Sequence, residues 1–316
     1  MRILITGGAG CLGSNLIDRY LPNGHKITVL DNFATGKKGN LPDLPSLSAF
    51  EGDIADLATL EEVFAHSKPE IVIHSAASYK DPSHWAEDAR TNIIGSINVA
   101  KLAEQHGCAG IINFQTALCY GRPSMLPIPT THPLFPFTSY GVSKTAGEQY
   151  LLQGKVPVVS LRLANITGPR LAIGPIPTFY KRLKAGQKCF CSASVRDFLD
   201  MDDFFELIDR LLDQPITHGV FNVSTGKGYS IKQIFDAVSD YLGIMPSEEV
   251  PILPVGADDV EKVVLDPSAT MEKFGWEAKV DFTSMINKML RWYDVNGVTD
   301  VFSHLAKQSI SGGATE

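Results

Sequence analysis

Cysteine is scarce in this sequence, and the few cysteines are not spaced for cross-linking. An odd number of thiols without a C-x-x-C pair favours reduced, packed side chains over a disulfide framework or a zinc site. The eight histidines are dispersed and form no H-E-x-x-H motif or cysteine–histidine cluster, so we predict no metal. The five cysteines are Cys11, Cys108, Cys119, Cys189 and Cys191.

Long apolar runs and basic clusters are also missing. No stretch approaches the ~18 apolar residues that a membrane-spanning helix needs, and no basic segment followed by an apolar one precedes the first strand. The 28 lysines and arginines are scattered and are outnumbered by 35 aspartates and glutamates, which gives a net charge of -7. We therefore expect a cytoplasmic protein that binds neither membranes nor nucleic acid.

Hydrophobic residues make up 44% of the 316 residues, enough for the core of an enzyme-sized globular protein. Short runs rich in β-branched residues alternate with helical stretches from the first residue onward, which is the α/β pattern. Gly, Pro or Asp bounds these runs, so we interpret them as buried parallel strands. They are RILIT, KITVLD, LSAFEGD, PEIVIHSAA, GIINFQT, VPVVSLRL and, much later, VFNVST.

Crossover helices are expected between the strands, because apolar residues recur there every three or four positions. Gly24, Gly107 and Gly154 stand where C-terminal caps would lie. Right-handed crossovers of this kind build a doubly wound parallel sheet of the Rossmann type. The helices are predicted over 14–24, 57–67, 90–107 and 139–154.

A smaller C-terminal unit is predicted where the pattern changes after Asn165. The segment TGPRLAIGPIP is rich in Gly and Pro, and the helix TFYKRLKAG follows it. Because VFNVST returns to the sheet, we expect two interleaved domains and a frayed tail. Residues 1–165 and about 196–225 would form the dinucleotide-binding domain, about 166–195 and 226–302 the substrate domain, and 303–316 the tail.

Gly7, Gly10 and Gly13 form a G-x-x-G-x-x-G motif, which also contains Cys11 and Leu12, directly after the first strand. Small residues here permit a tight turn, let the backbone approach a pyrophosphate, and bring helical amides to its phosphates. The alternative is a glycine-rich turn without a ligand. Strand, spacing and helix agree, so the sequence predicts a dinucleotide site.

The next two strands each end in an acidic residue. Asp31 lies eighteen residues after Gly13, where a carboxylate accepts hydrogen bonds from the adenosine ribose, which indicates NAD. Lys37 and Lys38 follow, but we interpret them as a solvated loop rather than as a 2'-phosphate site. Asp53 is a candidate to face the adenine amino group, and its alternative role is to cap the following helix.

Tyr140 and Lys144 are candidate catalytic residues, because a four-residue spacing places both on one face of a helix. The ammonium and the positive charge of a nicotinamide are expected to lower the pKa of the tyrosine toward that of a general base. Thr116 ends a strand at the ligand-binding edge of the sheet, where its hydroxyl could bridge substrate and tyrosine. Its alternative role is to bond a backbone group.

These motifs, taken in order, resemble the extended short-chain dehydrogenase/reductases that modify nucleotide sugars, above all the UDP-galactose 4-epimerase branch. The stretch from FQTALCYG to FYKRLKAG is similar to epimerases from bacterial surface-polysaccharide (O-antigen) gene clusters. The resemblance rests on GGAGCLG, LDN, GDI, HSAA, TNIIGSINV, TALCYG, TSYGVSK, RLANITGPR, VRDFLDMDD and FNVSTGKGYSI.

The resemblance implies a role for each matching residue. Thr116, Tyr140 and Lys144 would be the catalytic triad. Asn165 would touch the sugar nucleotide, and Arg196 and Asp259 would hold its diphosphate and ribose. The cofactor-binding residues implied, besides those above, are Asn32, Gly36, Ile54, Ser75, Ala76, Ala77, Lys80 and Asn92, together with Asp53, Tyr140 and Lys144.

Three departures narrow the choice within the family. Ala117 and Leu118 replace the Asp-Glu pair of the 4,6-dehydratases, so the acid and base for elimination are missing. Gly256 stands where many 4-epimerases have an arginine. Val263 stands where a bulky aromatic residue restricts the substituent at sugar C2, so we expect room for an N-acetyl group.

The prediction is therefore an NAD-dependent enzyme that inverts C4 of a UDP-sugar through a transient 4-keto intermediate. An N-acetylated hexose or hexuronic acid for bacterial surface polysaccharide is the expected substrate. A sugar carboxylate would need a cation, for which Lys80, Arg122 and Arg170 are candidates. The alternatives are a reductase, dehydrogenase or decarboxylase of the same family, or a non-catalytic NAD-binding protein.

A homodimer is expected because the helices near 92–106 and 140–153 pair across a two-fold axis in the resembling family. Apolar side chains on these helices would then be buried. The positions concerned are Ile94, Ile97, Leu102 and Tyr150.

Overall fold

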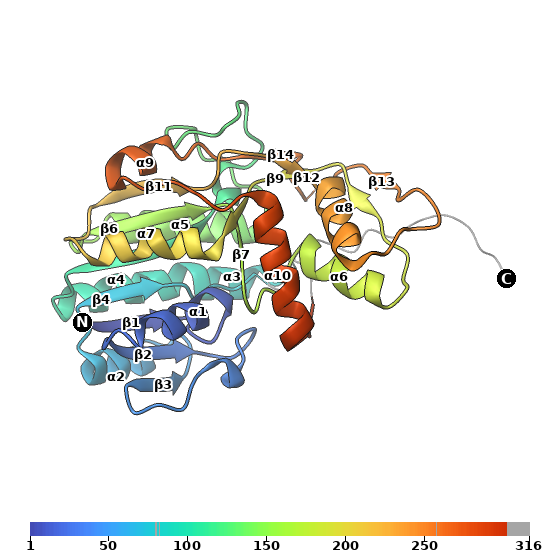
Figure 1. Cartoon of the computed structure of the whole chain (residues 1–316). Helices are drawn as coiled ribbons and strands as arrows, with labels where there is room; N and C mark the ends of the chain where they lie inside the picture. The colour runs from blue at the N-terminus through green and yellow to red at the C-terminus, as the bar shows by residue number, and fades with distance from the viewer. Residues whose placement is uncertain (80, 82, 257, 302–316) are drawn as a thin grey trace.

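A computed structural model describes residues 1–79, 81, 83–256 and 258–301. A layered α/β body contains the N-terminus, and a smaller group of elements lies beside it, with α10 (Phe282–Asn296) between them (Figure 1). The predicted tail 303–316, like Lys80, lies outside the described residues.

A seven-stranded sheet forms the centre of the larger body, and every neighbouring pair of its strands is parallel. The strand order β11-β6-β5-β4-β1-β2-β3 reverses direction at β1 and β4, as a doubly wound sheet requires. All seven predicted strands are confirmed. They are β1 (Arg2–Thr6), β2 (Lys26–Asp31), β3 (Leu47–Glu51), β4 (Ile71–His74), β5 (Gly110–Thr116), β6 (Val158–Leu163) and β11 (Gly219–Val223).

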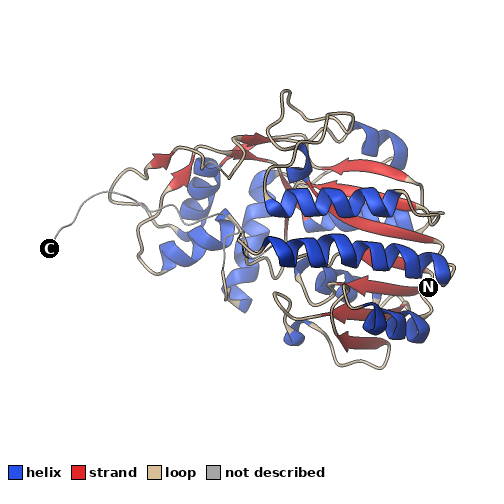
Figure 2. Ribbon diagram, turned by 180° about the vertical axis from the view of Figure 1, so that it is seen from behind, coloured by secondary structure: helices blue, strands red, loops and turns tan. Residues whose placement is uncertain are grey.

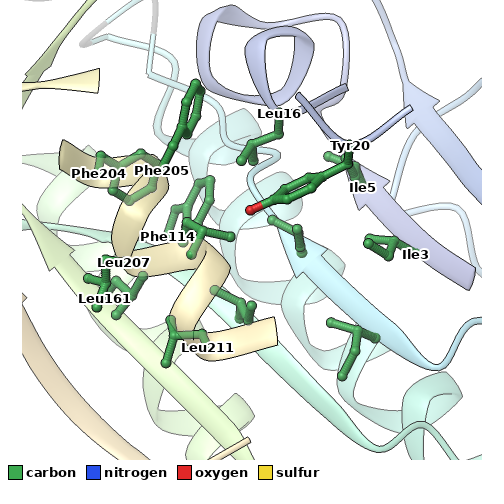
Figure 3. Close-up of a cluster of buried hydrophobic side chains, with 14 of the residues drawn as sticks. Ile3, Ile5, Leu16, Tyr20, Phe114, Leu161, Phe204, Phe205, Leu207 and Leu211 are labelled. Carbon is green, nitrogen blue, oxygen red and sulfur yellow. The ribbon is translucent and has the colours of Figure 1, made fainter. Parts of the chain in front are cut away.

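Helices cover both faces of this sheet, which explains why its strands are apolar on both sides. One face packs α1 (Cys11–Tyr20) and α7 (Met201–Leu212) around Ile5 and Phe114 (Figure 3). The other face packs α2 (Leu57–Ser67), α4 (Ser96–Gln105) and α5 (Ser139–Leu152) around Leu4 and Ile111. Long helices lie in front of the sheet in the reverse view (Figure 2).

The predicted helix over 90–107 is not regular. The short helix α3 (Trp85–Ala89), which was not predicted, precedes it, and the predicted range itself consists of a π-helical turn η2 (Arg90–Gly95) followed by α4. A Cβ atom at Gly147 of α5 would lie 2.2 Å from the carbonyl oxygen of Asn92, so α5 packs directly on the backbone of η2. Gly107 directly follows the C-cap of α4, His106, and adopts positive φ. Gly24 also has positive φ but is not a cap, because α1 ends at Tyr20 with Leu21 as its C-cap. Gly154 follows the C-cap of α5, Gln153, without positive φ.

A second hydrophobic core lies in the smaller group of elements, where α6 (Pro175–Lys184), α8 (Ile231–Leu242) and α10 pack together. Short strands and helices connect it to the sheet. The remaining elements are β7 (Asn165–Thr167), β8 (Cys191–Ser192), β9 (Val195–Arg196), β10 (Phe198–Asp200), β12 (Tyr229–Ser230), β13 (Ile252–Leu253), β14 (Lys262–Val263), α9 (Ser268–Phe274), η1 (Lys38–Asn40) and η3 (Ala117–Tyr120).

Candidate active site

A cavity of about 1060 Å³ extends from the carboxyl ends of the parallel strands into the smaller group of elements. Ligands bind at this edge in doubly wound sheets, next to the point where the strand order reverses. Most of the predicted site residues line it. They are Gly7, Gly10, Cys11, Leu12, Asp31, Asn32, Asp53, Ile54, Ser75, Ala76, Ala77, Thr116, Tyr140, Lys144, Asn165, Arg196, Asp259 and Val263.

The glycine turn between β1 and α1 has a backbone that side chains would not allow. Gly7 has φ +70°, and a Cβ there would lie 2.7 Å from the backbone nitrogen of Ala76. A Cβ at Gly13 would lie 2.5 Å from the carbonyl oxygen of Gly7, so this glycine brings helix and turn together without lining the cavity. The first turn of α1 has neither an acidic residue nor a side-chain cap. Its amides are therefore suited to a pyrophosphate.

Asp31 ends β2 with its carboxylate fixed by two backbone amides. Oδ2 accepts from the Ala9 N–H at 2.9 Å and Oδ1 from the Phe33 N–H at 2.8 Å. Burial raises the pKa of this carboxyl group. Each oxygen keeps a further lone pair for a ribose hydroxyl. Gly36 does not line the cavity, because its role is steric: a Cβ there would lie 2.9 Å from Asp31 Oδ1.

The two lysines that follow Asp31 each pair with an acidic side chain. Lys37 Nζ lies 2.7 Å from Asp300 Oδ2, just beyond α10, and Lys38 Nζ lies 2.6 Å from Glu51 Oε2. Neither side chain lines the cavity. Both ammonium groups therefore form ion pairs outside the cavity, in agreement with their interpretation as part of a solvated loop rather than of a 2'-phosphate site.

Asp53 does not cap the helix that follows it. Asp56 is the N-cap of α2, and its carboxylate accepts from the Ala58 N–H. The carboxylate of Asp53 accepts from Arg90 Nη1 at 2.5 Å and from the Ala55 N–H at 2.8 Å. Asp53 therefore lines the cavity with both oxygens engaged.

Asn92 supports the cavity floor without reaching its wall. The residue is 1% exposed, and its amide is hydrogen bonded on both sides. Oδ1 accepts from the Ser78 N–H at 2.9 Å, while Nδ2 donates to the Ser78 carbonyl and to Ser143 Oγ, each at 2.9 Å. These partners hold the amide next to the turn that follows β4, and the contact of Asn92 with a cofactor stays a prediction.

Thr116 lies at the end of β5, and Tyr140 and Lys144 lie in the first two turns of α5. Thr138 caps α5 by accepting from the Gly141 N–H at 3.1 Å, which fixes the start of the helix just before Tyr140. Thr116 Oγ1 accepts from the Leu118 N–H at 3.1 Å, which is the backbone role considered above. Its O–H can still donate toward the cavity.

Burial dominates the electrostatics of the tyrosine–lysine pair. It lowers the pKa of Lys144 to about 8, against an opposing effect of the Glu148 carboxylate. Burial, with Tyr79 and Asp88, raises the pKa of Tyr140 above its ordinary value. For the protein's own groups the pKa of the phenol is therefore raised rather than lowered, opposite to the expected direction, because desolvation disfavours the phenolate.

Arg196 and Asp259, expected to hold separate parts of a substrate, lie against each other. Arg196 Nη2 is 2.5 Å from Asp259 Oδ1, and both side chains are largely buried in the cavity wall. Burial lowers the pKa of the guanidinium. Asn165 donates to the Asp197 carbonyl at 2.9 Å. Val263 pairs with Arg196 across β14 and β9 and is 6% exposed.

Two basic residues named for a sugar carboxylate are not in the cavity wall. Arg122 stacks 4.5 Å from the ring centre of Phe137, and Arg170 pairs with Asp18 at 2.7 Å. Within the described part of the chain, the lysines and arginines that line the cavity are Lys144, Arg182 and Arg196.

Several lining residues were missed by the sequence analysis. Tyr79 lies with its ring centre 5.9 Å from that of Tyr140, and Phe179 and Phe190 come from the smaller group of elements. Gln115, which precedes Thr116, is 2% exposed and also lines the cavity. The available signal for Gln115 was a polar residue inside a buried strand, although Asn113 on the same strand carries the same signal.

Two kinds of feature are absent from the described residues. No group of three or more histidine, cysteine or acidic side chains among them could hold a metal ion. None of the helices described is both long and apolar enough to cross a membrane.

Proteins of known family and structure are similar to this chain over most of its length. The NAD dependent epimerase/dehydratase family matches residues 3–224. A UDP-glucose 4-epimerase of Mycolicibacterium smegmatis is 30% identical over 93% of this chain and 98% of its own. The crystal structure of the Bordetella bronchiseptica enzyme WbmG with NAD and UDP has a TM-score of 0.93 and 64% identity over 98% of this chain and 99% of that one. WbmH of the same organism, crystallised with NAD+, has a TM-score of 0.88 and 37% identity over 94% and 99% of the two chains.

Proposed function

The chain belongs to the NAD dependent epimerase/dehydratase family, and from this premise we propose that it inverts C4 of a UDP-sugar. The observation that carries the proposal is the joint placement of Thr116, Tyr140 and Lys144 in the wall of the cavity that the glycine turn also lines. Ala117 and Leu118 follow the threonine, so a dehydratase's acid and base are absent from those positions.

The cofactor is NAD, and the glycine turn fits it because Cβ atoms at Gly7 and Gly13 would collide with the backbone that forms the tight turn. The amides at the start of α1 would hold its pyrophosphate, and Asp31 would hold its adenosine ribose. When bound, this cofactor would supply reversible hydride transfer at sugar C4.

The protein's own groups move and hold the proton. Tyr140 Oη takes the proton of the C4 hydroxyl as hydride leaves C4, and gives it back when the keto group is reduced. Thr116 donates its O–H to the same substrate oxygen. The Lys144 ammonium, together with the bound cofactor's charge, opposes the desolvation that raises the pKa of the phenol. The walls of the cavity keep the 4-keto intermediate from leaving while the sugar rotates to present its opposite face to the cofactor.

The substrate we propose is an N-acetylated UDP-hexose or UDP-hexuronic acid used for bacterial surface polysaccharide. Asn165, Arg196 and Asp259 bind the nucleotide part, and Arg196 supplies charge for the diphosphate in the absence of an arginine at Gly256. The small side chain of Val263 leaves room for an acetamido group at C2. Lys80 is the candidate counterion for a C5 carboxylate, because Arg122 and Arg170 have other partners.

The domain boundaries predicted from the sequence are part of the proposal, although Phe274 and Trp276 pack in the core of the sheet. The sheet, residues 1–165 and about 196–225, binds the dinucleotide. The remaining residues up to 302 bind the sugar nucleotide together with Asn165 and Arg196. All five cysteines are unpaired, which fits a reducing compartment, and we place the protein in the cytoplasm.

A homodimer through η2, α4 and α5 is part of the same proposal. Ile94 is 47% exposed and Tyr150 is 50% exposed, and Val142 adds a third exposed apolar side chain at 47%. Ile97 is partly exposed. Leu102 is 1% exposed and packs in the chain's own core, so its assignment to the interface is wrong.

A panel of UDP-sugars incubated with the holoenzyme and followed by proton NMR tests the proposal. We expect inversion at C4 without added NADH, fastest with N-acetylated sugars, and a loss of rate on the order of 10² or more in Tyr140→Phe. Turnover that requires added NAD or NADH, or loss of carbon dioxide from a uronic acid, would indicate another activity of the family. NAD binding without turnover of any sugar would indicate a non-catalytic protein.

A further inference from the structure

Gln115 joins the two elements that bear the proposed catalytic groups. It lies on β5 immediately before Thr116, and its side chain is 2% exposed. Nε2 donates to the backbone carbonyl of Lys144 at 2.8 Å. Oε1 accepts from the backbone N–H of Thr116 at 2.7 Å. One amide therefore hydrogen bonds to the backbones of two members of the proposed triad.

The local topology explains why these backbone groups need a side chain. The pairing of β4 with β5 ends where His74 lies opposite Asn113, so β5 continues without a strand neighbour on that side. The Thr116 N–H takes the amide oxygen of Gln115 as its acceptor there. Without this acceptor the Thr116 N–H would be left without a hydrogen-bond partner, which is unfavourable away from water.

Gln115 also occupies the correct face of the sheet for this contact. Side chains of a strand alternate between its two faces, so residues four apart lie on the same face. Ile111, four residues before Gln115, packs on the face that α2, α4 and α5 cover. Gln115 shares the face of Ile111 and reaches α5. The Thr116 side chain points to the other face. The Gln115 side chain therefore links the backbone of Thr116, at the end of β5, to the backbone of Lys144 in the second turn of α5.

We infer that Gln115 is a positioning residue that fixes Thr116 relative to Lys144 and Tyr140, and so sets the rate of proton transfer. The inference rests on the proposed function, because it assumes the roles given to these three residues. Gln115 itself takes no part in proton transfer, since its amide is occupied by two backbone groups. A shift of about 1 Å between positioned groups can cost on the order of 10²-fold in rate.

The first test is Gln115→Leu, which removes both hydrogen bonds at similar volume. We expect kcat to fall 10-fold or more, with KM for the UDP-sugar and Kd for NAD and UDP changed less than 3-fold, because ligand contacts remain. Asn113→Leu is the matched control. Asn113 lies on the same strand and face, is 1% exposed, and donates to Ser160 Oγ at 2.9 Å. It should lose stability with kcat nearly unchanged.

Gln115→Glu separates positioning from packing, because a protonated carboxyl group is nearly isosteric with the amide. When neutral, it donates O–H to the Lys144 carbonyl and accepts from the Thr116 N–H. When ionised, it presents only acceptors, and the contact with the Lys144 carbonyl becomes repulsive. Burial places its titration above the ordinary glutamate pKa of about 4.3. We expect its kcat, relative to the parent at the same pH, to rise as the pH is lowered through this titration.

The outcomes distinguish this inference from the proposed function. If the parent epimerises a UDP-sugar and Gln115→Leu keeps kcat within 2-fold, the inference is wrong and the function stands. If the parent epimerises none, the function is wrong, and hydrogen exchange of the Thr116 amide decides. At least 10-fold faster exchange in Gln115→Leu than in Asn113→Leu would support the bridge, and equal exchange would overturn it.

Discussion

Lys144 should destabilise the folded protein at neutral pH, and its replacement by methionine should reveal by how much. The side chain is 5% exposed, and burial lowers its pKa from 10.5 to about 8. The folded state therefore binds the proton less tightly than the unfolded chain does. Between these two pKa values the unfolded chain carries more protons, so the stability of the parent rises with pH.

The size of the effect follows from the two pKa values. Each unit of difference is worth about 1.4 kcal/mol, so the buried ammonium costs roughly 3 kcal/mol of unfolding free energy at pH 7. The cost falls to about 2 kcal/mol at pH 9 and to less than about 1 kcal/mol at pH 10. Lys144→Met should be more stable than the parent by these amounts, plus a pH-independent packing difference, while its turnover is lost.

Urea unfolding of the NAD-free proteins at pH 7, 8, 9 and 10 measures the difference. Lys273→Met, at an exposed position on α9, is the control and should show a difference that does not vary with pH. A constant difference for Lys144→Met across this range, or a gain that grows with pH, would refute the reasoning. Either result would mean that burial in the folded protein does not lower the pKa of Lys144.

Four other predictions concern the cofactor, the core, the substrate and the assembly. Asp31→Ala should weaken NAD binding by about 10- to 100-fold, the range for losing a charge-assisted hydrogen bond, and should reduce the preference for NAD over NADP; a parent that already prefers NADP in titrations contradicts the ribose assignment. Glu148→Gln should cost about 3–5 kcal/mol in urea unfolding, because it leaves the Arg162 charge buried without its partner at 2.7 Å. Glu148→Met combined with Arg162→Met should recover more than half of that loss, and a double variant no better than the single one contradicts the explanation. Val263→Tyr should slow an N-acetylated UDP-sugar by roughly 10-fold or more relative to UDP-glucose, and an equal effect on both would mean that Val263 only packs in the core. The parent should sediment as a dimer at micromolar concentration and Tyr150→Glu as a weaker one, whereas a monomeric parent excludes the proposed interface.

The central sheet was predictable because its strands carry their signal locally. Runs such as ITVL and IVIH are rich in β-branched residues, apolar on both faces, and bounded on at least one side by Gly, Pro or Asp, so neither position nor parallel pairing needed knowledge of distant residues. The π-helical turn η2 could not be predicted in this way. Its shape depends on close packing against Gly147, more than fifty residues away in the chain.

The candidate site likewise contains features that local sequence predicts and features that depend on residues far apart in the chain. The glycine turn, Asp31 and the Tyr140–Lys144 spacing follow from local motifs, and the structure brings them to one cavity. The bond between Asn92 and Ser143 and the pairing of Arg196 with Asp259 join residues far apart in sequence, so they became visible only in the fold. The direction of the Tyr140 pKa shift also depends on burial, which the spacing of two residues on a helix does not determine.

The most direct test of C4 epimerisation is the fate of a deuterium atom placed on sugar C4. The holoenzyme, supplied with no other reductant, is incubated in ordinary water with the labelled UDP-sugar that it turns over, and NMR locates the label in the product. The account predicts that the inverted sugar keeps deuterium at C4 and that no NADH is released. Loss of the label to solvent, or release of NADH with an oxidised sugar, would contradict it.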